Sequence, residues 1–130
     1  MDEQDFQFLK LLIERASYMN TYWNFFIGVS SAIIGILASG KNFTRNSGLK
    51  AILVLVFIVF AISNFGAISS LVDQRHALLW QLSSDFPTDL SKSLQPKTYG
   101  EYLAFHLVLD LLVVICILFV PWHLLHKKSE

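Results

Sequence analysis

The sequence predicts an all-α membrane protein with three transmembrane helices, the first and second extended beyond the bilayer on the N-terminal side, in an oligomeric helical bundle. Three apolar windows predict the spans, at residues 16–40, 51–72 and 102–126. Each is long enough, because roughly 20 apolar residues at about 1.5 Å rise cross a hydrocarbon core of about 30 Å. Of the 10 basic and 10 acidic residues in the chain, only Asp110 falls inside a window. The chain, residues 1–130, is therefore expected to be a single membrane domain.

The first helix is predicted over about residues 3–39. No Pro or Gly interrupts the chain before Gly28, and Gly40 is a typical residue for ending a helix. A helix of this length is longer than one bilayer crossing. Residues 1–17 are therefore expected to extend outside the membrane.

The second helix is predicted over about residues 49–85. Its residues stay compatible with a helix beyond the apolar window, and Pro87 then ends it, because the residue before a proline disfavours helical geometry. The linker that follows, residues 86–98, is expected to hold one short turn at 89–94. The second helix thus also extends beyond the bilayer on the N-terminal side.

The third helix is predicted over about residues 99–125. Thr98 stands three residues before Glu101, which is the spacing of a capping box. In this motif the Thr98 hydroxyl caps the first turn and the Glu101 carboxylate reaches back to the Thr98 amide. The third helix is therefore expected to begin directly after Thr98.

The orientation in the membrane stays open. Half of the chain's 10 Lys and Arg lie on each side of the predicted membrane, so the positive-inside rule gives a tie. Asn42-Phe43-Thr44 is a glycosylation sequon and predicts a lumenal loop, whereas Lys127-Lys128 resembles a dilysine retrieval signal and predicts a cytosolic end. With three spans both motifs lie on the same face, so at least one of them is a chance match.

Two stripes of small and polar residues follow the heptad spacing of alternating fours and threes. The first stripe, on the first helix, consists of Glu3, Gln7, Lys10, Glu14, Ser17, Thr21, Asn24, Gly28, Ser31, Gly35 and Ala38. The second stripe, on the second helix, consists of Ser63, Ala67, Ser70, Gln74, Ala77, Gln81 and Ser84.

Two interpretations of the stripes stay open. In the first, the first two spans form an antiparallel hairpin with their stripes facing each other, because small residues let helices approach closely in lipid. In the second, the first stripe faces the axis of a symmetric oligomer and lines a water-filled path. The candidate pore or seam residues are Thr21, Asn24, Gly28, Ser31 and Gly35.

A polar cluster is predicted inside the membrane. Counting about 1.5 Å per residue from the centre of each span puts Asn64, His106 and Asp110 in the same half of the bilayer. A charge at this depth costs at least about 2.5 kcal/mol on insertion scales, so Asp110 is a functional-site hypothesis. Its expected partner is His106, four residues earlier on one helix face, or Asn64 if Asp110 is protonated. The cluster is either polar fastening between helices or an ion- or proton-responsive site.

Motifs of the main catalytic and binding classes are missing from the sequence. A serine elbow, a phosphate-binding glycine loop and paired carboxylates in a pocket are absent, so we expect no enzyme, no catalytic residues and no cofactor. Cys116 is the only cysteine and no His spacing suits zinc, so no metal site is expected. With zero net charge and no dense basic cluster, no nucleic-acid partner is expected.

Together these observations predict a small integral membrane protein that self-associates and forms an ion-conducting or membrane-permeabilising pore. Its expected partners are membrane lipid and further copies of the chain, with residues 1–17 and 73–98 free to bind another protein. The alternative is a non-conducting scaffolding or accessory subunit of a larger membrane complex. In architecture the chain resembles pore-forming effectors of bacterial phage defence, which implies an antiviral role in a bacterial inner membrane.

Overall fold

Helices account for all the regular structure that can be described. The computed structural model describes residues 3–39, 46–83 and 86–120. These residues form α1 (Glu3–Ala38), α2 (Ser47–Trp80), α3 (Thr88–Leu94) and α4 (Tyr99–Phe119). By length and composition α1, α2 and the segment Thr88–Phe119 can each cross a membrane. The predicted all-α protein with three candidate membrane spans is confirmed.

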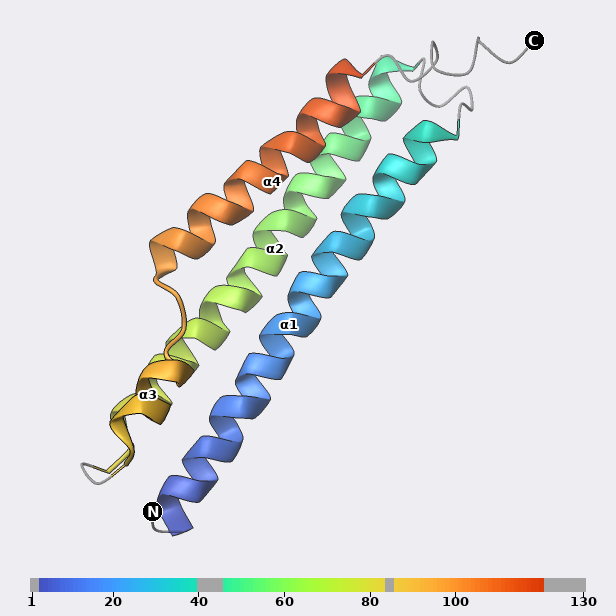
Figure 1. Cartoon of the computed structure of the whole chain (residues 1–130). Coiled ribbons are helices and arrows are strands. Elements are labelled where there is room, and N and C mark those ends of the chain that lie inside the picture. Colours follow the sequence, from blue (N-terminus) through green and yellow to red (C-terminus); the bar gives the residue numbers. More distant parts are fainter. Residues whose placement is uncertain (1–2, 40–45, 84–85, 121–130) are drawn as a thin grey trace.

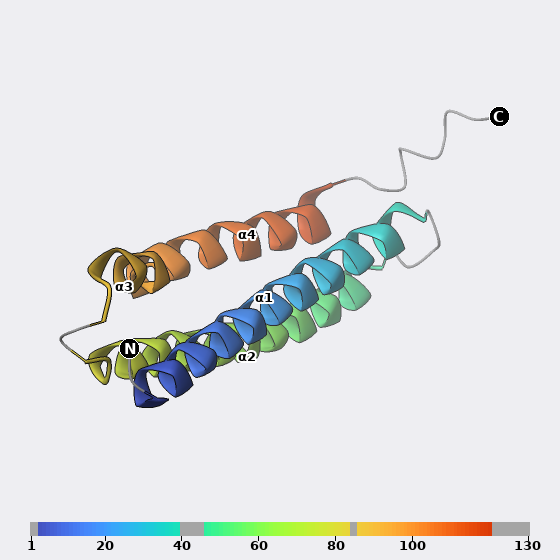
Figure 2. The same ribbon diagram turned by 60° about the horizontal axis from the view of Figure 1, so that its bottom comes forward.

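The three long helices lie side by side, and α2 runs back along α1 (Figure 1). α3 lies at the end of the bundle where the chain begins, and α4 returns along α2. After a turn of 60° α1 still lies along α2, whereas α4 lies to one side of this pair (Figure 2). The molecule is therefore an α1–α2 hairpin with α4 packed on one side.

Large apolar side chains build the core between the three helices. On α1 the buried residues Asp5, Leu12, Met19, Phe26 and Ile33 recur every seven positions, and we call them the inner seam of α1. On α2 the buried positions alternate steps of four and three, at Phe57, Ala61, Asn64, Ile68, Leu71 and Arg75. α4 contributes His106, Val113 and Ile117. Such repeats keep one face of each helix towards its neighbour along the whole contact.

The start of α2 is fixed by a side-chain cap. The Asn46 side-chain oxygen accepts hydrogen bonds from the amides of Gly48 at 2.9 Å and Leu49 at 3.2 Å. These bonds satisfy two of the amides that have no partner within a helix's first turn. α2 therefore begins at Ser47, slightly before the predicted start near residue 49.

The end of α2 is tied to the start of α1. The carboxylate of Asp5 accepts the backbone amide of Ser83 at 3.0 Å and the Ser83 hydroxyl at 2.6 Å. The Ser83 amide therefore donates to the Asp5 side chain of α1, and not to a backbone carbonyl one turn earlier in α2. α2 ends at Trp80, before the predicted end near residue 85.

The capping box at the start of α4 is present as the sequence predicts. The Glu101 carboxylate accepts the Thr98 amide and the Thr98 hydroxyl, each at 2.9 Å, and the Glu101 amide donates to the Thr98 hydroxyl at 3.4 Å. Glu101 precedes the apolar window, and the Thr98 amide, followed by the Thr98 hydroxyl, lowers the pKa of this carboxyl below its ordinary value. The box therefore holds Glu101 ionised and fixes where α4 begins.

α4 ends earlier than the predicted helix of about residues 99–125. Its last residue is Phe119, and Val120 is extended, with φ of −71° and ψ of 124°. The sequence explains this geometry, because Val120 precedes Pro121, whose ring disfavours helical geometry in the residue before it. The remainder of the predicted helix lies outside the described residues.

Candidate functional site

His106 and Asp110 form the polar pair expected from their spacing on α4. The Nδ1 atom of His106 lies 2.8 Å from Oδ2 of Asp110. A proton held between these atoms can reside on the ring, where Nδ1 donates to the carboxylate, or on the carboxyl group. In either form the acid carries a hydrogen-bond partner at a depth where a free charge is costly.

Aromatic rings from α1 and α2 enclose the imidazole of His106, which is only 1% exposed. Its ring centroid lies 4.6 Å from that of Phe26, 5.3 Å from that of Phe65 and 5.6 Å from that of Trp23. His106 therefore inserts from α4 between the other two helices. The imidazole of the polar pair thus packs against both helices of the α1–α2 hairpin.

Several buried polar atoms of the three residues in the predicted cluster lack hydrogen-bond partners among the described residues. They are His106 Nε2, Asp110 Oδ1 and both side-chain amide atoms of Asn64. The alternative bond between Asp110 and Asn64 is therefore not formed, although Asn64 is buried on the core face of α2. The structure brings His106 and Asp110 together and leaves Asn64 outside the pair.

Asp110 also reaches the surface of the bundle. Its side chain is 22% exposed, against 2% for the His106 side chain. Together with His106 it lines a groove of about 200 Å³ between α2 and α4, whose other lining residues are Ala61, Ile62, Phe65, Leu103 and Leu107. The His106 imidazole is thus buried, whereas the Asp110 side chain is partly exposed although its Oδ1 atom is buried.

The first stripe lies on the face of α1 that points away from the core. Gly28 follows Phe26 by two residues, and Gly35 follows Ile33 by two, which corresponds to about 200° around an α-helix. A Cβ at Gly28 or Gly35 would have no heavy atom within 4 Å in the described part of the chain. All five candidate pore or seam residues are exposed: Thr21, Asn24, Gly28, Ser31 and Gly35.

The second stripe lies beside the core face of α2. Its members Ala67, Ser70 and Gln74 each precede a buried residue by one position, which is about 100° of rotation. Ser70 and Gln74 are exposed and bond each other, with Gln74 Nε2 donating to Ser70 Oγ at 3.3 Å. The second stripe therefore borders the hairpin contact instead of forming it.

The two stripes do not form the main hairpin contact, although Thr21 of the first stripe shares a groove with Ala67, Ser70 and Gln74 of the second. α1 and α2 do form a hairpin, but their contact consists of large side chains such as Phe26 and Phe57, whose ring centroids lie 6.2 Å apart. Large side chains offer more atoms for dispersion contacts, and such contacts stabilise helix packing in lipid. The five candidate pore or seam residues of the first stripe are left exposed.

Sequence reasoning missed two buried charged side chains. Arg75 is 7% exposed, and its Nη2 donates to the Leu94 carbonyl at 2.7 Å, which holds the end of α3 against α2. Asp5 is 2% exposed in its bond to Ser83. Both could have been found from the repeats, since Asp5 continues the spacing of Leu12 and Arg75 that of Leu71.

Neither a metal site nor a known relative supplies a function. Among the residues that the structure describes, no group of three His, Cys, Asp or Glu side chains could hold a metal ion. Comparison with known proteins found no matching family model, no matching curated protein and no matching solved structure. Functional inference therefore rests on the geometry of the chain itself.

Proposed function

We propose that this chain forms a homo-oligomer in a bacterial inner membrane through the first stripe, and that the oligomer conducts ions or permeabilises the membrane. The observation that supports the proposal most directly is the position of the stripe. Its members from Ser17 to Gly35 lie on the exposed outer face of α1, opposite the inner seam, whereas Ala38 packs against the core. No part of the described chain covers this face at Gly28 or Gly35.

Small residues on this face suit close contact with another helix. Ser31 and Gly35 have the small-xxx-small spacing that lets transmembrane backbones approach, and Gly28 lies one turn earlier on the same face. A symmetric ring would place the same face of every copy around one axis. A second copy of the chain is the partner that supplies a matching helix.

The same face also carries polar side chains. These favour an environment of water, as in a pore along the axis of the oligomer, over one of lipid. Asn24 is exposed, and an amide that faces hydrocarbon without partners costs several kcal/mol. Thr21 has one hydrogen-bond partner within α1, because its hydroxyl donates to the Ser17 carbonyl at 3.1 Å. Since α1 has 36 residues, its stripe would line a path of about 54 Å.

The polar pair takes a supporting place in this proposal. His106 and Asp110 lie on α4, and the imidazole packs against the inner side of α1 at Phe26. With the first stripe around the axis, the pair lies behind the pore wall and holds α4 against the hairpin. A defence effector of bacteria is one biological setting in which such a pore would serve.

The test is the ion conductance of liposomes or planar bilayers that contain the purified protein. Wild-type protein is expected to raise conductance, and Thr21→Leu, Asn24→Leu and Ser31→Leu are each expected to reduce it strongly, because Leu narrows and dries the path. Ala104→Leu is the matched control, since Ala104 is an exposed small residue on α4. This control is expected to conduct as the wild type does.

Two outcomes would overturn the proposal. One is a membrane that stays tight at every protein density. The other is unchanged conductance in all three stripe variants while circular dichroism shows intact helices. A ring of four or more copies in nanodiscs would support the proposal, whereas a monomer would count against it.

A non-conducting accessory subunit is the second candidate function, favoured by the surface around α3. Trp80 is 87% exposed at the end of α2. It lines a groove of about 540 Å³ whose other lining residues are His76, Leu79, Leu82, Ser91, Gln95, Pro96 and Thr98. An exposed aromatic side chain beside a groove is typical of protein contacts. In that case liposomes stay tight, and a partner co-purifies with the wild type but not with Trp80→Ala.

A further inference from the structure

We infer that a groove between α1 and α2 binds the headgroup of an anionic phospholipid. This border groove has a volume of about 530 Å³ and is lined by Arg15, Tyr18, Thr21, Tyr22, Ala67, Ser70, Leu71 and Gln74. The volume lies within the range of ordinary small-molecule sites, about 300 to 1,000 Å³. The inference does not require that the protein conducts ions, although Thr21 belongs both to this groove and to the first stripe.

The position of the border groove matches the depth of a lipid headgroup. Arg15 and Gln74 lie just outside the apolar windows, which begin at residue 16 on α1 and end at residue 72 on α2. Thr21 and Ala67 lie inside the windows. Because the lining runs from polar to apolar residues, a lipid phosphate near Arg15 would leave its acyl chains in hydrocarbon.

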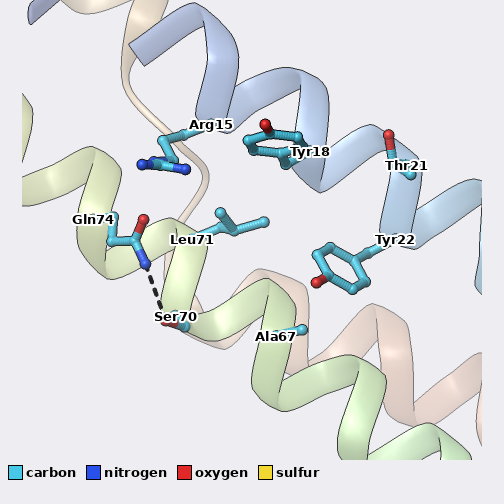
Figure 3. Close-up of a pocket in the computed structure, with 8 residues that line it drawn as sticks. All are labelled: Arg15, Tyr18, Thr21, Tyr22, Ala67, Ser70, Leu71 and Gln74. Carbon is cyan, nitrogen blue, oxygen red and sulfur yellow. Dashed lines mark hydrogen bonds between the residues drawn. The ribbon is translucent and has the colours of Figure 1, made fainter. Parts of the chain in front are cut away.

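The side chains of the border groove suit a phosphate. Arg15 and Gln74 extend into the groove from opposite helices, and the Tyr22 hydroxyl points towards α2 (Figure 3). Arg15 lies over the Tyr18 ring, with 5.8 Å from its Cζ to the ring centroid, which orients the guanidinium. A guanidinium presents paired N–H donors to phosphate oxygens, and amide and hydroxyl groups can supply further donors.

Charge also favours an anion here. The lining of the border groove contains one cation, Arg15, and no carboxylate. The acids nearest in sequence, Glu14 and Asp73, are not among its lining residues. Within the described residues no carboxylate lies within 4.0 Å of the Arg15 guanidinium. Its charge is therefore available to a ligand that approaches from the membrane.

Native mass spectrometry of the full-length protein tests this site. The probes are dioleoyl phosphatidylglycerol and dioleoyl phosphatidylcholine, which share acyl chains and differ in headgroup charge. Wild-type protein is expected to bind the anionic lipid about tenfold more tightly, because both headgroups carry a phosphate but the choline ammonium of the second lipid offsets its charge at Arg15. Arg15→Gln is expected to remove the difference, and Arg15→Lys to keep part of it because the charge stays while the paired donors are lost.

Lys50→Gln is the matched control, because it removes one positive charge at the start of α2, at the other end of the hairpin. It is expected to bind both lipids as the wild type does.

Equal affinity for the two lipids in the wild type would overturn the inference. So would an equal loss in Lys50→Gln and Arg15→Gln, which would indicate general attraction by charge. An unchanged lipid preference in Arg15→Gln, with an altered number of copies, would assign the border groove to a second copy of the chain and overturn it too. If Arg15→Gln does not fold, the same comparison is made with Arg15→Lys, for which an affinity equal to the wild type would overturn the inference.

Discussion

The two faces of α1 carry the same seven-residue repeat with opposite kinds of side chain. On the inner seam Met19, Phe26 and Ile33 are large and buried. Two positions later on the helix, the first stripe places small or polar residues, all exposed. A heptad repeat therefore shows which residues share one side of the helix. It does not show which other helix packs against that side. The size of the side chains decides which repeat the chain buries by itself.

This difference separates the requirements of folding from those of assembly. Packing within one chain needs the large residues of the inner seam, because a close contact with many atoms stabilises helices in lipid. The exposed stripe contributes nothing comparable to the isolated bundle. Variants on the inner seam should therefore change the free energy of unfolding, whereas variants on the first stripe should change the number of copies.

Phe26→Ala should have the largest effect on folding. Phe26 is 1% exposed, and its ring lies against Trp23, Phe57, Phe60 and His106. Removing a buried phenyl ring leaves a cavity and is expected to lower the free energy of unfolding by about 3 to 5 kcal/mol. Denaturant titration in detergent micelles measures this quantity. A loss below about 1 kcal/mol, the usual effect of an unremarkable substitution, would mean that this face is not the core.

Asp110→Ala should have an intermediate effect. It removes the acceptor of the 2.8 Å contact and leaves Nδ1 of the buried His106 without a partner. Side-chain hydrogen bonds inside membrane proteins contribute about 0.6 kcal/mol on average and up to about 1.7 kcal/mol. Asp110→Asn retains an acceptor, so it is expected to lose less stability in the same titration.

Asp110→Asn also tests where the polar pair lies relative to the proposed pore. If the first stripe surrounds the axis, this variant should conduct as the wild type does in the liposome measurement. A folded Asp110→Asn protein that no longer conducts would place the carboxylate in the conducting path.

Gly28→Leu should have the smallest effect on folding and a clear effect on assembly. A Cβ at Gly28 meets no described atom within 4 Å, and Leu favours a helix over Gly by less than about 1 kcal/mol. The unfolding titration should therefore show little change, in the stabilising direction. Light scattering after size-exclusion chromatography should show fewer copies per particle, with Ala104→Leu as the unchanged control. A wild-type number of copies in Gly28→Leu would show that the first stripe does not serve assembly.

Local patterns predicted the elements better than their ends. The apolar windows and the Thr98 capping box follow from neighbouring residues, and the sequence contains all that they require. The end of α2 does not, because Asp5 bonds Ser83 across 78 residues of sequence. The residues near Ser83 suit a helix, so only this distant contact reveals that the helix stops at Trp80.

The candidate site was predictable to the extent that one helix determines it. His106 and Asp110 are four residues apart on α4, and their contact follows from helix geometry. Asn64 comes from another helix, and a depth count could not reveal that aromatic rings surround the imidazole of His106. The stripes show the same limit. Their spacing can be taken from the sequence, but the helix that each stripe faces depends on how the three long helices pack.

The bond between Asp5 and Ser83 has a consequence for biosynthesis. Asp5 lies in α1 and Ser83 lies shortly after α2, so both residues are translated before α4. Because the N-terminal part of a chain leaves the ribosome first, the hairpin can close before α4 is complete. Phe26 and Phe65 would then already be in place when His106 packs against them. Because His106 precedes Asp110 on α4, the acid would enter the membrane together with its hydrogen-bond partner.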